Sequence, residues 1–436
     1  MSKYDNASLV QIPSGYKAGT LYSVLPANGD GDFDFTRASI ATRVNAEGLI
    51  ETVASGVPRL DYPLLNGVVQ SCPALLLEPS RTNTFTYSDA FDNAYWTKTA
   101  STITANDTIS PNGSLNADKL HTNTSSAEHS VLSGNQSIVS GTNYTVSLFA
   151  KAAEKKFLFI GWNSAGFGSP ATSFFDLTTG EYLAGSGQTI TVEKFPNGWY
   201  RFTTTRTANA TTSTNTGIRI GLCDGLSTSI TTGSNTIDGI YIYGAQFEAG
   251  SYATSYIPTS GSTVARAADV CNGAGTSAEF NDSEGVLFAE ISNISNDSTQ
   301  KYIAISDNTL NNRVNILYNS ASNQFRFLVR SASVTSVDST YNVNSVEDFN
   351  KVALKYKSND VGVWINGFEV ITDTSVTTPI GLSKLSFDSG GGTVPFYGKT
   401  KQIGYYDTVL SDSELEYLTS YRSLSEMVTE LNLNTL

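Results

Sequence analysis

The chain has 436 residues, which at roughly 150 residues per domain favours two to four domains. It carries 27 Lys and Arg against 40 Asp and Glu, a net charge of −13, which argues against the basic face that a nucleic-acid binder needs. Hydrophobic residues (39%) can build cores, but no apolar run approaches the roughly 18 residues of a membrane span. Ser, Thr, Asn and Gly replace charged residues and suit turns and solvent-facing strand positions. We therefore expect a soluble, β-rich protein that neither binds nucleic acid nor inserts into a membrane.

Sulfur and imidazole chemistry is sparse. Cys72, Cys223 and Cys271 are far apart and form no CxxC pair, so neither a zinc site nor a disulfide framework is expected. The first residues, MSKYDNASLVQIPSG, lack the basic start and apolar segment of a signal peptide. We expect synthesis in the cytoplasm and no export by the general route, a combination that fits a virion component released by lysis.

Residues 1–79 are typical of short alternating strands, and we expect them to form an N-terminal β segment for attachment or oligomerisation. Six charged residues are placed to form ion pairs, either solvated or between chains: Arg37, Arg43, Arg59, Asp32, Asp34 and Asp61. A ligand site is the alternative. A core this thin is more stable when it packs against copies of itself, which favours a homotrimer assembled through residues 1–80 with some help from the C-terminal helix.

Strand-like runs then recur about every 10 residues, separated by NG, TTG and GSG turns. This spacing predicts a jelly-roll domain over residues 80–258. A Gly/Ser/Thr-rich stretch predicts a linker over 259–275. A second set of strands predicts another sandwich over 276–412, in which Asn366-Gly367 is a strong hairpin signal.

Residues 413–436 are predicted to be a C-terminal helix and tail. Ser411 or Ser413 can cap its start, and Ser411 and Glu414 have the spacing of a capping box. An apolar stripe follows at helical spacing, and we expect it to cover its own sandwich, with a neighbouring copy as the alternative: Leu415, Leu418, Tyr421, Leu424 and Val428. The predicted fold is thus all-β: an N-terminal β segment, two β-sandwich (jelly-roll) domains and a short C-terminal helix.

Several strings resemble a module that recurs in bacteriophage tail and fibre proteins: FTRASIATRVNAEGLIETVASGVPRLDYP, CPALLLEPSRTN (72–83), FDNAYWTKT (91–99), SPNGSLNADKL (110–120) and YGAQFEAGSYATSYIPTSGSTVARAADV (243–270). The middle domain, with FPNGWYRFT, resembles jelly-roll carbohydrate-binding modules. Residues 285–420, with VWINGFEV and GKTKQIGYYDTVLSDSELEYL, are similar to concanavalin A-like domains of the laminin-G type. These folds host lectins, adhesion modules and enzymes alike.

Enzymatic activity is not expected. Glycan hydrolysis needs two carboxylates set about 5–10 Å apart across a cleft. No ExDxxE string occurs in 285–400, where Glu290 and Asp307 stand alone. His121 and His129 are both expected in a Ser/Thr/Asn-rich loop, without a nucleophile motif such as GxSxG nearby.

Sugar binding needs an aromatic face beside short polar side chains. Trp162 and Asn163 end an alternating strand at a Gly-rich loop, and Tyr95 and Trp96 lie in a polar loop. These four residues are the candidate glycan contacts, with Trp162 first, and a role in the core or as a lid is the alternative for each tryptophan.

Trp199 and Trp364 are expected in the core. The resemblance to jelly-roll modules also implies a structural calcium ion, for which Asp238, Asp89 and Asp92 are the candidate ligands. The alternative is that these aspartates are turn residues.

The expected function is that of a phage virion fibre or receptor-binding protein that adheres to host-surface glycan without a reaction. A structural decoration protein of the capsid or tail is the alternative, and a glycan depolymerase ranks third. The expected partners are its own copies, other virion proteins and host-surface glycan. The expected location is the virion surface, after synthesis in the host cytoplasm.

Overall fold

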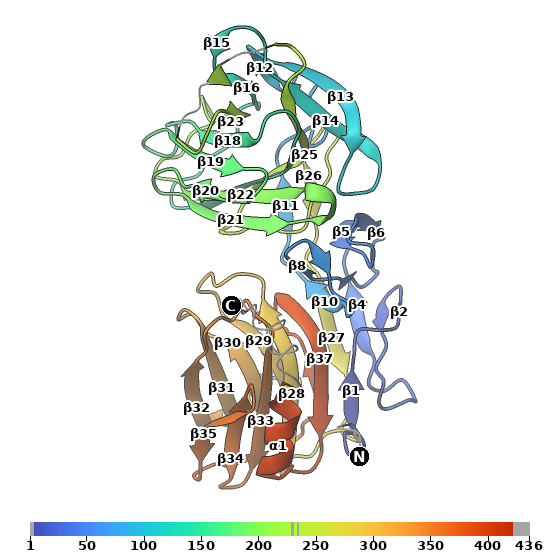
Figure 1. The fold of residues 1–436 in the computed structure, drawn as a ribbon. Coiled ribbons are helices and arrows are strands. Elements are labelled where there is room, and N and C mark those ends of the chain that lie inside the picture. Colours follow the sequence, from blue (N-terminus) through green and yellow to red (C-terminus); the bar gives the residue numbers. More distant parts are fainter. Residues whose placement is uncertain (1–3, 228–230, 233–234, 422–436) are drawn as a thin grey trace.

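The computed structural model describes residues 4–227, 231–232 and 235–421, and it is nearly all β. Its strands build two β-sandwiches, one above the other in Figure 1, with short hairpins where the two meet. The prediction of an all-β chain with sandwich sheets and a short C-terminal helix is confirmed. Within the described ranges, no helix is long and apolar enough to cross a membrane.

The upper sandwich comes from the middle of the chain, where apolar and polar residues alternate along the strands. One sheet has the order β12-β16-β23-β18-β19-β20, and the facing sheet has the order β13-β14-β25-β17-β22-β21. The first sheet consists of β12 (Thr97–Thr99), β16 (His129–Leu132), β18 (Phe157–Trp162), β19 (Ala171–Asp176), β20 (Tyr182–Leu183) and β23 (Ile218–Cys223). The second consists of β13 (Thr102–Ile109), β14 (Leu115–His121), β17 (Asn143–Ala152), β21 (Thr189–Lys194), β22 (Tyr200–Thr207) and β25 (Gly239–Ala249). Leu148, Ile160 and Phe202 are among the side chains that fill the core between them.

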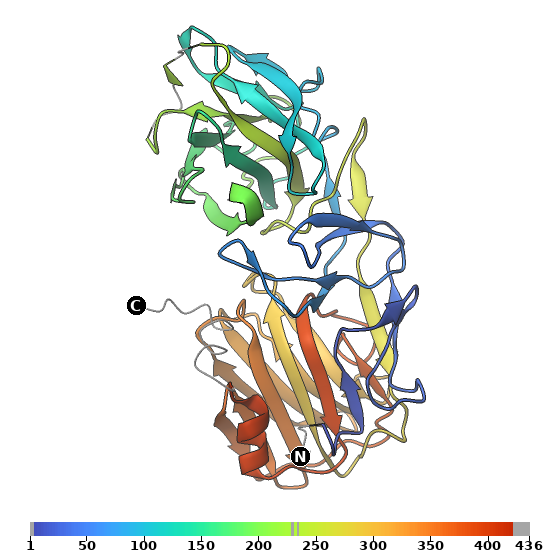
Figure 2. The same ribbon diagram turned by 45° about the vertical axis from the view of Figure 1, so that its right-hand side comes forward.

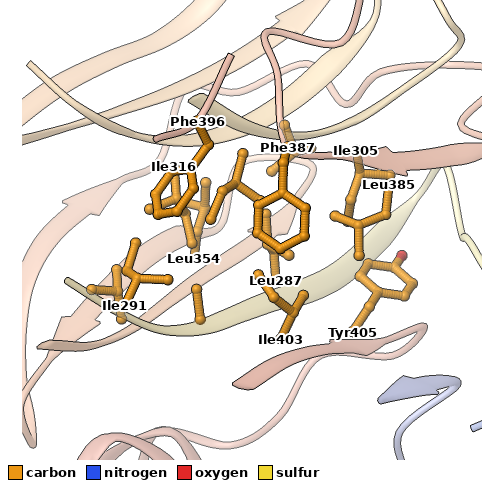
Figure 3. Close-up of a cluster of buried hydrophobic side chains, with 14 of the residues drawn as sticks. Leu287, Ile291, Ile305, Ile316, Leu354, Leu385, Phe387, Phe396, Ile403 and Tyr405 are labelled. Carbon is orange, nitrogen blue, oxygen red and sulfur yellow. The ribbon is translucent and has the colours of Figure 1, made fainter. Parts of the chain in front are cut away.

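The lower sandwich combines strands from both ends of the chain. One sheet has the order β35-β34-β33-β28-β37-β10-β7, with β1 also paired to β37, and the other has the order β2-β3-β4-β27-β36-β29-β30-β31-β32. The first consists of β1 (Leu9–Gln11), β7 (Leu60–Asp61), β10 (Ala74–Leu77), β28 (Glu284–Asn293), β33 (Asn350–Lys357), β34 (Val361–Ile365), β35 (Phe368–Asp373) and β37 (Gly398–Tyr406). The second consists of β2 (Tyr16–Lys17), β3 (Thr20–Leu21), β4 (Phe33–Thr36), β27 (Val270–Ala274), β29 (Lys301–Ser306), β30 (Arg313–Tyr318), β31 (Gln324–Ser331), β32 (Val334–Asn342) and β36 (Lys384–Ser386). Figure 3 shows part of its core, including Leu287, Phe387 and Ile403.

The N-terminal residues are not a separate segment, which corrects the predicted boundary at residue 79. Leu9 pairs with Tyr405, and Leu75 pairs with Thr400, so β1 and β10 both extend the sheet of the C-terminal sandwich. Phe33 and Phe35 of β4 are buried in the same core. The thin core on which the homotrimer prediction rested is therefore completed within one chain.

The predicted linker over 259–275 is also wrong in part, because it contains two strands. Strand β27 pairs with both β4 and β36, and Cys271 and Ala274 are buried in the lower core. Strand β26 (Val264–Arg266) pairs with β11 (Arg81–Asn83). This ladder joins the segment that enters the upper sandwich to the segment that leaves it.

Short hairpins from residues 41–69 pack against the upper sandwich (Figure 2). These hairpins are β5 (Ala41–Val44) with β6 (Ile50–Val53), and β8 (Leu64–Leu65) with β9 (Val68–Val69). The remaining short elements lie elsewhere in the chain: β15 (Ser126–Ala127) with β24 (Thr231–Thr232), and the 3-10 turn at Pro196–Gly198. Ile50 packs among Phe149, Phe195 and Trp199, and its N–H donates to the carbonyl of Pro111 at 2.9 Å. The hairpins thus tie the two sandwiches together.

Five charged side chains are buried together where the chain passes between the sandwiches. Arg37 pairs with Asp269 at 3.0 Å, Arg59 pairs with Glu78 at 2.7 Å and also with Asp269, and Arg266 pairs with Glu78 at 2.5 Å. Burial alone raises the pKa of Glu78, but Arg266 and Arg59 outweigh it and hold that pKa well below its usual range. Because three guanidinium groups surround two carboxylates, Glu78 stays ionised.

The structure gives the charged N-terminal residues other ion-pair partners than those predicted. Arg43 pairs with Glu51 at 2.6 Å across the β5–β6 hairpin, and Asp61 pairs with Lys399 at 3.0 Å. Asp32 accepts hydrogen bonds from Ser23 instead of from an arginine. These partners lie far apart in sequence or on the opposite strand, so local spacing does not reveal them.

Helix α1 (Asp412–Thr419) begins as predicted. The N–H of Ser411 donates to Glu414 Oε2 at 2.8 Å, which is half of a capping box. Leu415 and Leu418 are buried on the outer face of their own sandwich, beside Trp364. Leu424 and Val428 lie outside the described residues.

Candidate functional site

Trp162 is in the core and is not a sugar platform, which corrects its prediction as the first glycan contact. Its side chain is 0% exposed, and its indole N–H donates to Thr204 Oγ1 at 2.9 Å. Leu158, Ile160 and Trp162 alternate along β18 and all enter the core between the sheets. Asn163 follows the strand and is half-buried.

Trp96 is also fully buried, which corrects the second candidate. Its indole N–H donates to the carbonyl of Tyr87 at 2.8 Å, and its ring packs against Phe85 and Phe91. Tyr95, in contrast, is half-buried, and its ring is perpendicular to that of Trp96. Tyr95 alone among the four candidates combines an aromatic ring with a position at the surface.

Tyr95 lines a hollow of about 560 Å³ between strand β11 and the rim of the upper sandwich. We call this hollow the Tyr95 groove, and the residues that matter to the argument are Arg81, Thr84, Tyr95, Asn135, Gln136 and Tyr144. An aromatic ring, hydroxyl groups, carboxamides and a guanidinium group therefore face the same space. Such donors, acceptors and apolar faces are what hydroxyl-rich ligands require.

A hydrogen-bond network fixes the position of Tyr95. The buried Gln136 donates through Nε2 to Tyr95 Oη at 3.1 Å and to the carbonyl of Gly134 at 2.8 Å. It accepts at Oε1 from Thr84 Oγ1 at 2.7 Å. Gly134 leaves room for the ring, since a Cβ there would lie 2.7 Å from Tyr95 Cε2. Because Tyr95 Oη, Thr84 Oγ1 and both polar atoms of the Gln136 amide have partners, the Tyr95 ring is held in one orientation.

The opposite wall of the groove is equally well supported. Tyr144 stacks on Phe247 with ring centroids 5.3 Å apart, and its hydroxyl accepts the N–H of Val139 at 2.9 Å. Asn135 is exposed, and its Oδ1 accepts from Thr216 N–H at 3.0 Å, which leaves the amide NH₂ directed to other partners. Sequence analysis missed Gln136, Asn135 and Tyr144, and the polar run SGNQS (133–137) was the available signal.

A second hollow, of about 180 Å³, gathers oxygen ligands. Asp89 and Asp92, both predicted as calcium ligands, line it together with Asp118 and two asparagines, Asn106 and Asn116. Asp238 does not line this hollow, which corrects the third predicted ligand; its carbonyl accepts the N–H of Thr122 at 3.0 Å.

Asp118 is the most perturbed carboxyl of this hollow. Its oxygens accept backbone N–H groups from Asn106 at 2.9 Å and Phe91 at 2.8 Å. Burial raises its pKa to about 6, and the charges of Asp92 and Asp89 add to the rise.

The carboxylate and carboxamide oxygens around Asp118 are of the kind that calcium prefers as ligands. Among them, Asn116 Oδ1 is buried without a hydrogen-bond partner. In the part of the chain that the structure describes, however, no group of three or more His, Cys, Asp or Glu is arranged to hold a metal ion. Calcium at this hollow stays a prediction.

No protein-family model matches the sequence, and no curated protein matches it. Solved structures with a similar fold include a leech intramolecular trans-sialidase in complex with 2,7-anhydro-Neu5Ac (19% identity, 33% of this chain and 24% of that chain, TM-score 0.28). They also include the CBM40 module of a Ruminococcus gnavus IT-sialidase bound to α2,6-sialyllactose (18% identity, 32% and 85%, TM-score 0.27). A third is the mouse laminin α1 chain, domains LG4-5 (13% identity, 69% and 90%, TM-score 0.22).

This chain thus spans about a quarter of the leech enzyme's length. A carbohydrate-binding module and laminin-G domains are among its structural neighbours. With identities and TM-scores this low, no ligand and no residue role carries over from these proteins to this chain.

Proposed function

We propose that the chain binds a glycan through the Tyr95 groove, without catalysing a reaction. The observation that carries the proposal is the half-buried Tyr95 ring, held by Gln136 beside exposed hydroxyl and carboxamide groups in a hollow of about 560 Å³. Sugars present apolar C–H faces and many hydroxyls, which match an aromatic face and short polar side chains. Few of these hydrogen bonds give a net gain over water, so each site binds weakly, with a Kd on the order of 0.1–1 mM.

The wider role that we propose is adhesion by a bacteriophage virion fibre or receptor-binding protein. Its support is the resemblance of the strings in 72–120 and 243–270 to phage tail and fibre modules. Host-surface glycan, other virion proteins and own copies in a homotrimer are the partners in this proposal, and the virion surface is the location, after synthesis in the host cytoplasm. Several copies on one particle raise weak binding by roughly 10²–10⁴ through avidity.

A printed array of neutral and acidic oligosaccharides tests the binding proposal. We expect the wild-type chain to be retained and the Tyr95→Ala variant to lose retention while its melting curve stays cooperative. Tyr182→Ala is the matched control, because Tyr182 is a 49% exposed tyrosine on β20, outside the groove. A chain that binds none of the glycans supports the alternative of a structural decoration protein. Release of new reducing ends from a bound glycan supports the depolymerase. Light scattering of the purified chain tests the trimer.

A further inference from the structure

A further hollow, distinct from the Tyr95 groove and from the hollow around Asp118, lies between the two sandwiches. It has a volume of about 350 Å³ and is lined from both sides, by Phe149, Glu193 and Arg201 of the upper sandwich and by Asn293, Phe349 and Lys399 of the lower one. We call it the inter-sandwich cleft. Small-ligand pockets are commonly about 300–1,000 Å³, so the cleft suits a short saccharide. It shares no lining residue with the Tyr95 groove.

Contacts on both sides of the cleft hold its walls in place. The hairpin turns at Gly48 and Gly67 press against Pro196 and against Lys194 with Phe195, close to Glu193 in the sequence. A Cβ at Gly48 would lie 2.7 Å from Pro196 Cγ, which shows how closely the two surfaces approach. The cleft is therefore organised before any ligand arrives, which lowers the cost of binding.

Glu193 is the unusual group in the cleft. Its side chain is exposed, and its carboxylate makes no hydrogen bond or ion pair with any residue that the structure describes. The protein that surrounds it on both sides displaces water and raises its pKa, which outweighs the opposite effect of Lys399 and Arg201. An exposed carboxylate that has no partner in the protein is free to accept a hydrogen bond from a ligand hydroxyl.

The remaining polar groups of the cleft are partly engaged. Lys399 pairs with Asp61 at 3.0 Å. Arg201 is buried, and its guanidinium group donates to Ser147 Oγ at 3.0 Å and to the carbonyl of Thr254 at 2.7 Å, but its Nε has no partner. Its guanidinium group lies 5.3 Å from the centre of the Phe149 ring. The cleft thus offers donors, acceptors and aromatic faces with both signs of charge.

We propose that the inter-sandwich cleft is a second saccharide-binding site, built jointly by both sandwiches, for a neutral hydroxyl-rich sugar that Glu193 accepts from. The lining carries four carboxylates (Asp61, Glu78, Glu193 and Glu347) against three cations (Arg43, Arg201 and Lys399), and this excess of negative charge disfavours an acidic sugar. This inference rests on the proposed function only in the class of ligand, since the residues involved are different.

The test uses the full chain in four forms: wild type, Glu193→Gln, Tyr95→Ala and the control Glu181→Gln. Glu181 is an exposed glutamate next to β20 and lines neither the cleft nor the groove. The neutral oligosaccharide that the array retains best is titrated into each. We expect Glu193→Gln to weaken binding about tenfold, as the loss of one charge-assisted hydrogen bond does, and Glu181→Gln to leave it unchanged.

A second readout does not rely on comparing the affinities of the variants. Carbodiimide with glycinamide amidates accessible carboxyl groups, and mass spectrometry measures the extent at each residue. We expect the same oligosaccharide to protect Glu193 and to leave Glu181 unprotected. Unchanged binding by Glu193→Gln together with no protection of Glu193 would overturn the inference and leave the Tyr95 groove in place. Loss of oligosaccharide binding by Glu193→Gln together with full binding by Tyr95→Ala would instead overturn the proposal that the Tyr95 groove binds glycan. A wild-type chain that binds no oligosaccharide would overturn both.

Discussion

At the scale of single residues, burial decides between two roles for Trp162. A sugar platform must be accessible, whereas this side chain is 0% exposed and packs against Phe167 and Phe247. Replacing Trp162 by Ala should cost about 3–5 kcal/mol of unfolding free energy, because it leaves a large cavity in the core. Urea denaturation measures this loss. A Trp162→Ala chain of wild-type stability that no longer binds glycan would contradict the core assignment.

We predict that calcium binding at the hollow around Asp118 depends on pH. The pKa of Asp118 in the folded chain, about 6, lies above its ordinary value of 3.8. Its contribution to stability is therefore fully present below about pH 3.8 and is lost as the pH rises through 6. A calcium ion among Asp89, Asp92 and Asp118 would compensate the charge that forms. We expect calcium to raise the melting temperature at pH 7.5 and to have little effect at pH 4.5.

The calcium prediction has its own control. Asp92→Asn removes the negative charge of one exposed carboxylate and should abolish the calcium response, while Glu181→Gln should keep it. Equal melting temperatures with calcium and with a chelator at pH 7.5, in the wild-type chain, would remove calcium from this hollow.

Residue positions could be predicted from the sequence only where a local pattern determines them. Leu158, Ile160 and Trp162 alternate along one strand and share one face, a local pattern that indicates the core, yet Trp162 was predicted as a glycan contact because a Gly-rich loop follows it. Gln136 and Thr84 meet through the tertiary fold, 52 positions apart, so no spacing in the sequence joins them to Tyr95. The groove could therefore be anticipated only through its aromatic residue.

At the scale of elements, local signals were reliable and long-range pairing was not. Asn366 and Gly367 adopt positive φ angles of 51° and 91° at the β34–β35 turn, as the hairpin signal predicts. Leu9 pairs with Tyr405 across nearly the whole chain, and nothing in the pattern of a three-residue strand identifies such a partner. The sequence therefore predicts the short strands of residues 1–79 as a separate segment, because their patterns do not identify partners in the C-terminal sandwich.

The hairpin turns give a matched pair of substitutions. Gly48 and Gly56 both have positive φ angles, 77° and 71°, so alanine strains either one by about 1–2 kcal/mol. Only at Gly48 would the new Cβ collide with the upper sandwich, whereas nothing lies within 4 Å of a Cβ at Gly56. We expect Gly48→Ala to cost about 1–3 kcal/mol more than Gly56→Ala in urea denaturation. Equal losses would show that the hairpin does not press on the upper sandwich.

At the scale of the whole molecule, the lower sandwich needs both ends of the chain. A chain of residues 276–436 lacks β1, β4, β10 and β27 and exposes the core that Leu9, Phe33 and Leu75 cover. We expect it to show no cooperative unfolding, whereas residues 80–258 should unfold cooperatively, since they hold a complete core. Calorimetry of the two fragments distinguishes them. A cooperative transition in residues 276–436 would mean that the N-terminal strands are dispensable.

The central claim is that a glycan binds at Tyr95, and one titration tests it most directly. The neutral oligosaccharide that the wild-type chain retains best on the array is titrated into isotopically labelled wild-type and Tyr95→Ala chains and followed by NMR. We predict a Kd on the order of 0.1–1 mM for the wild type, with shifts at Asn135 and Gln136, and a loss of at least about tenfold in Tyr95→Ala. Equal affinity of the two chains, with no shift at Asn135 or Gln136, would contradict the claim.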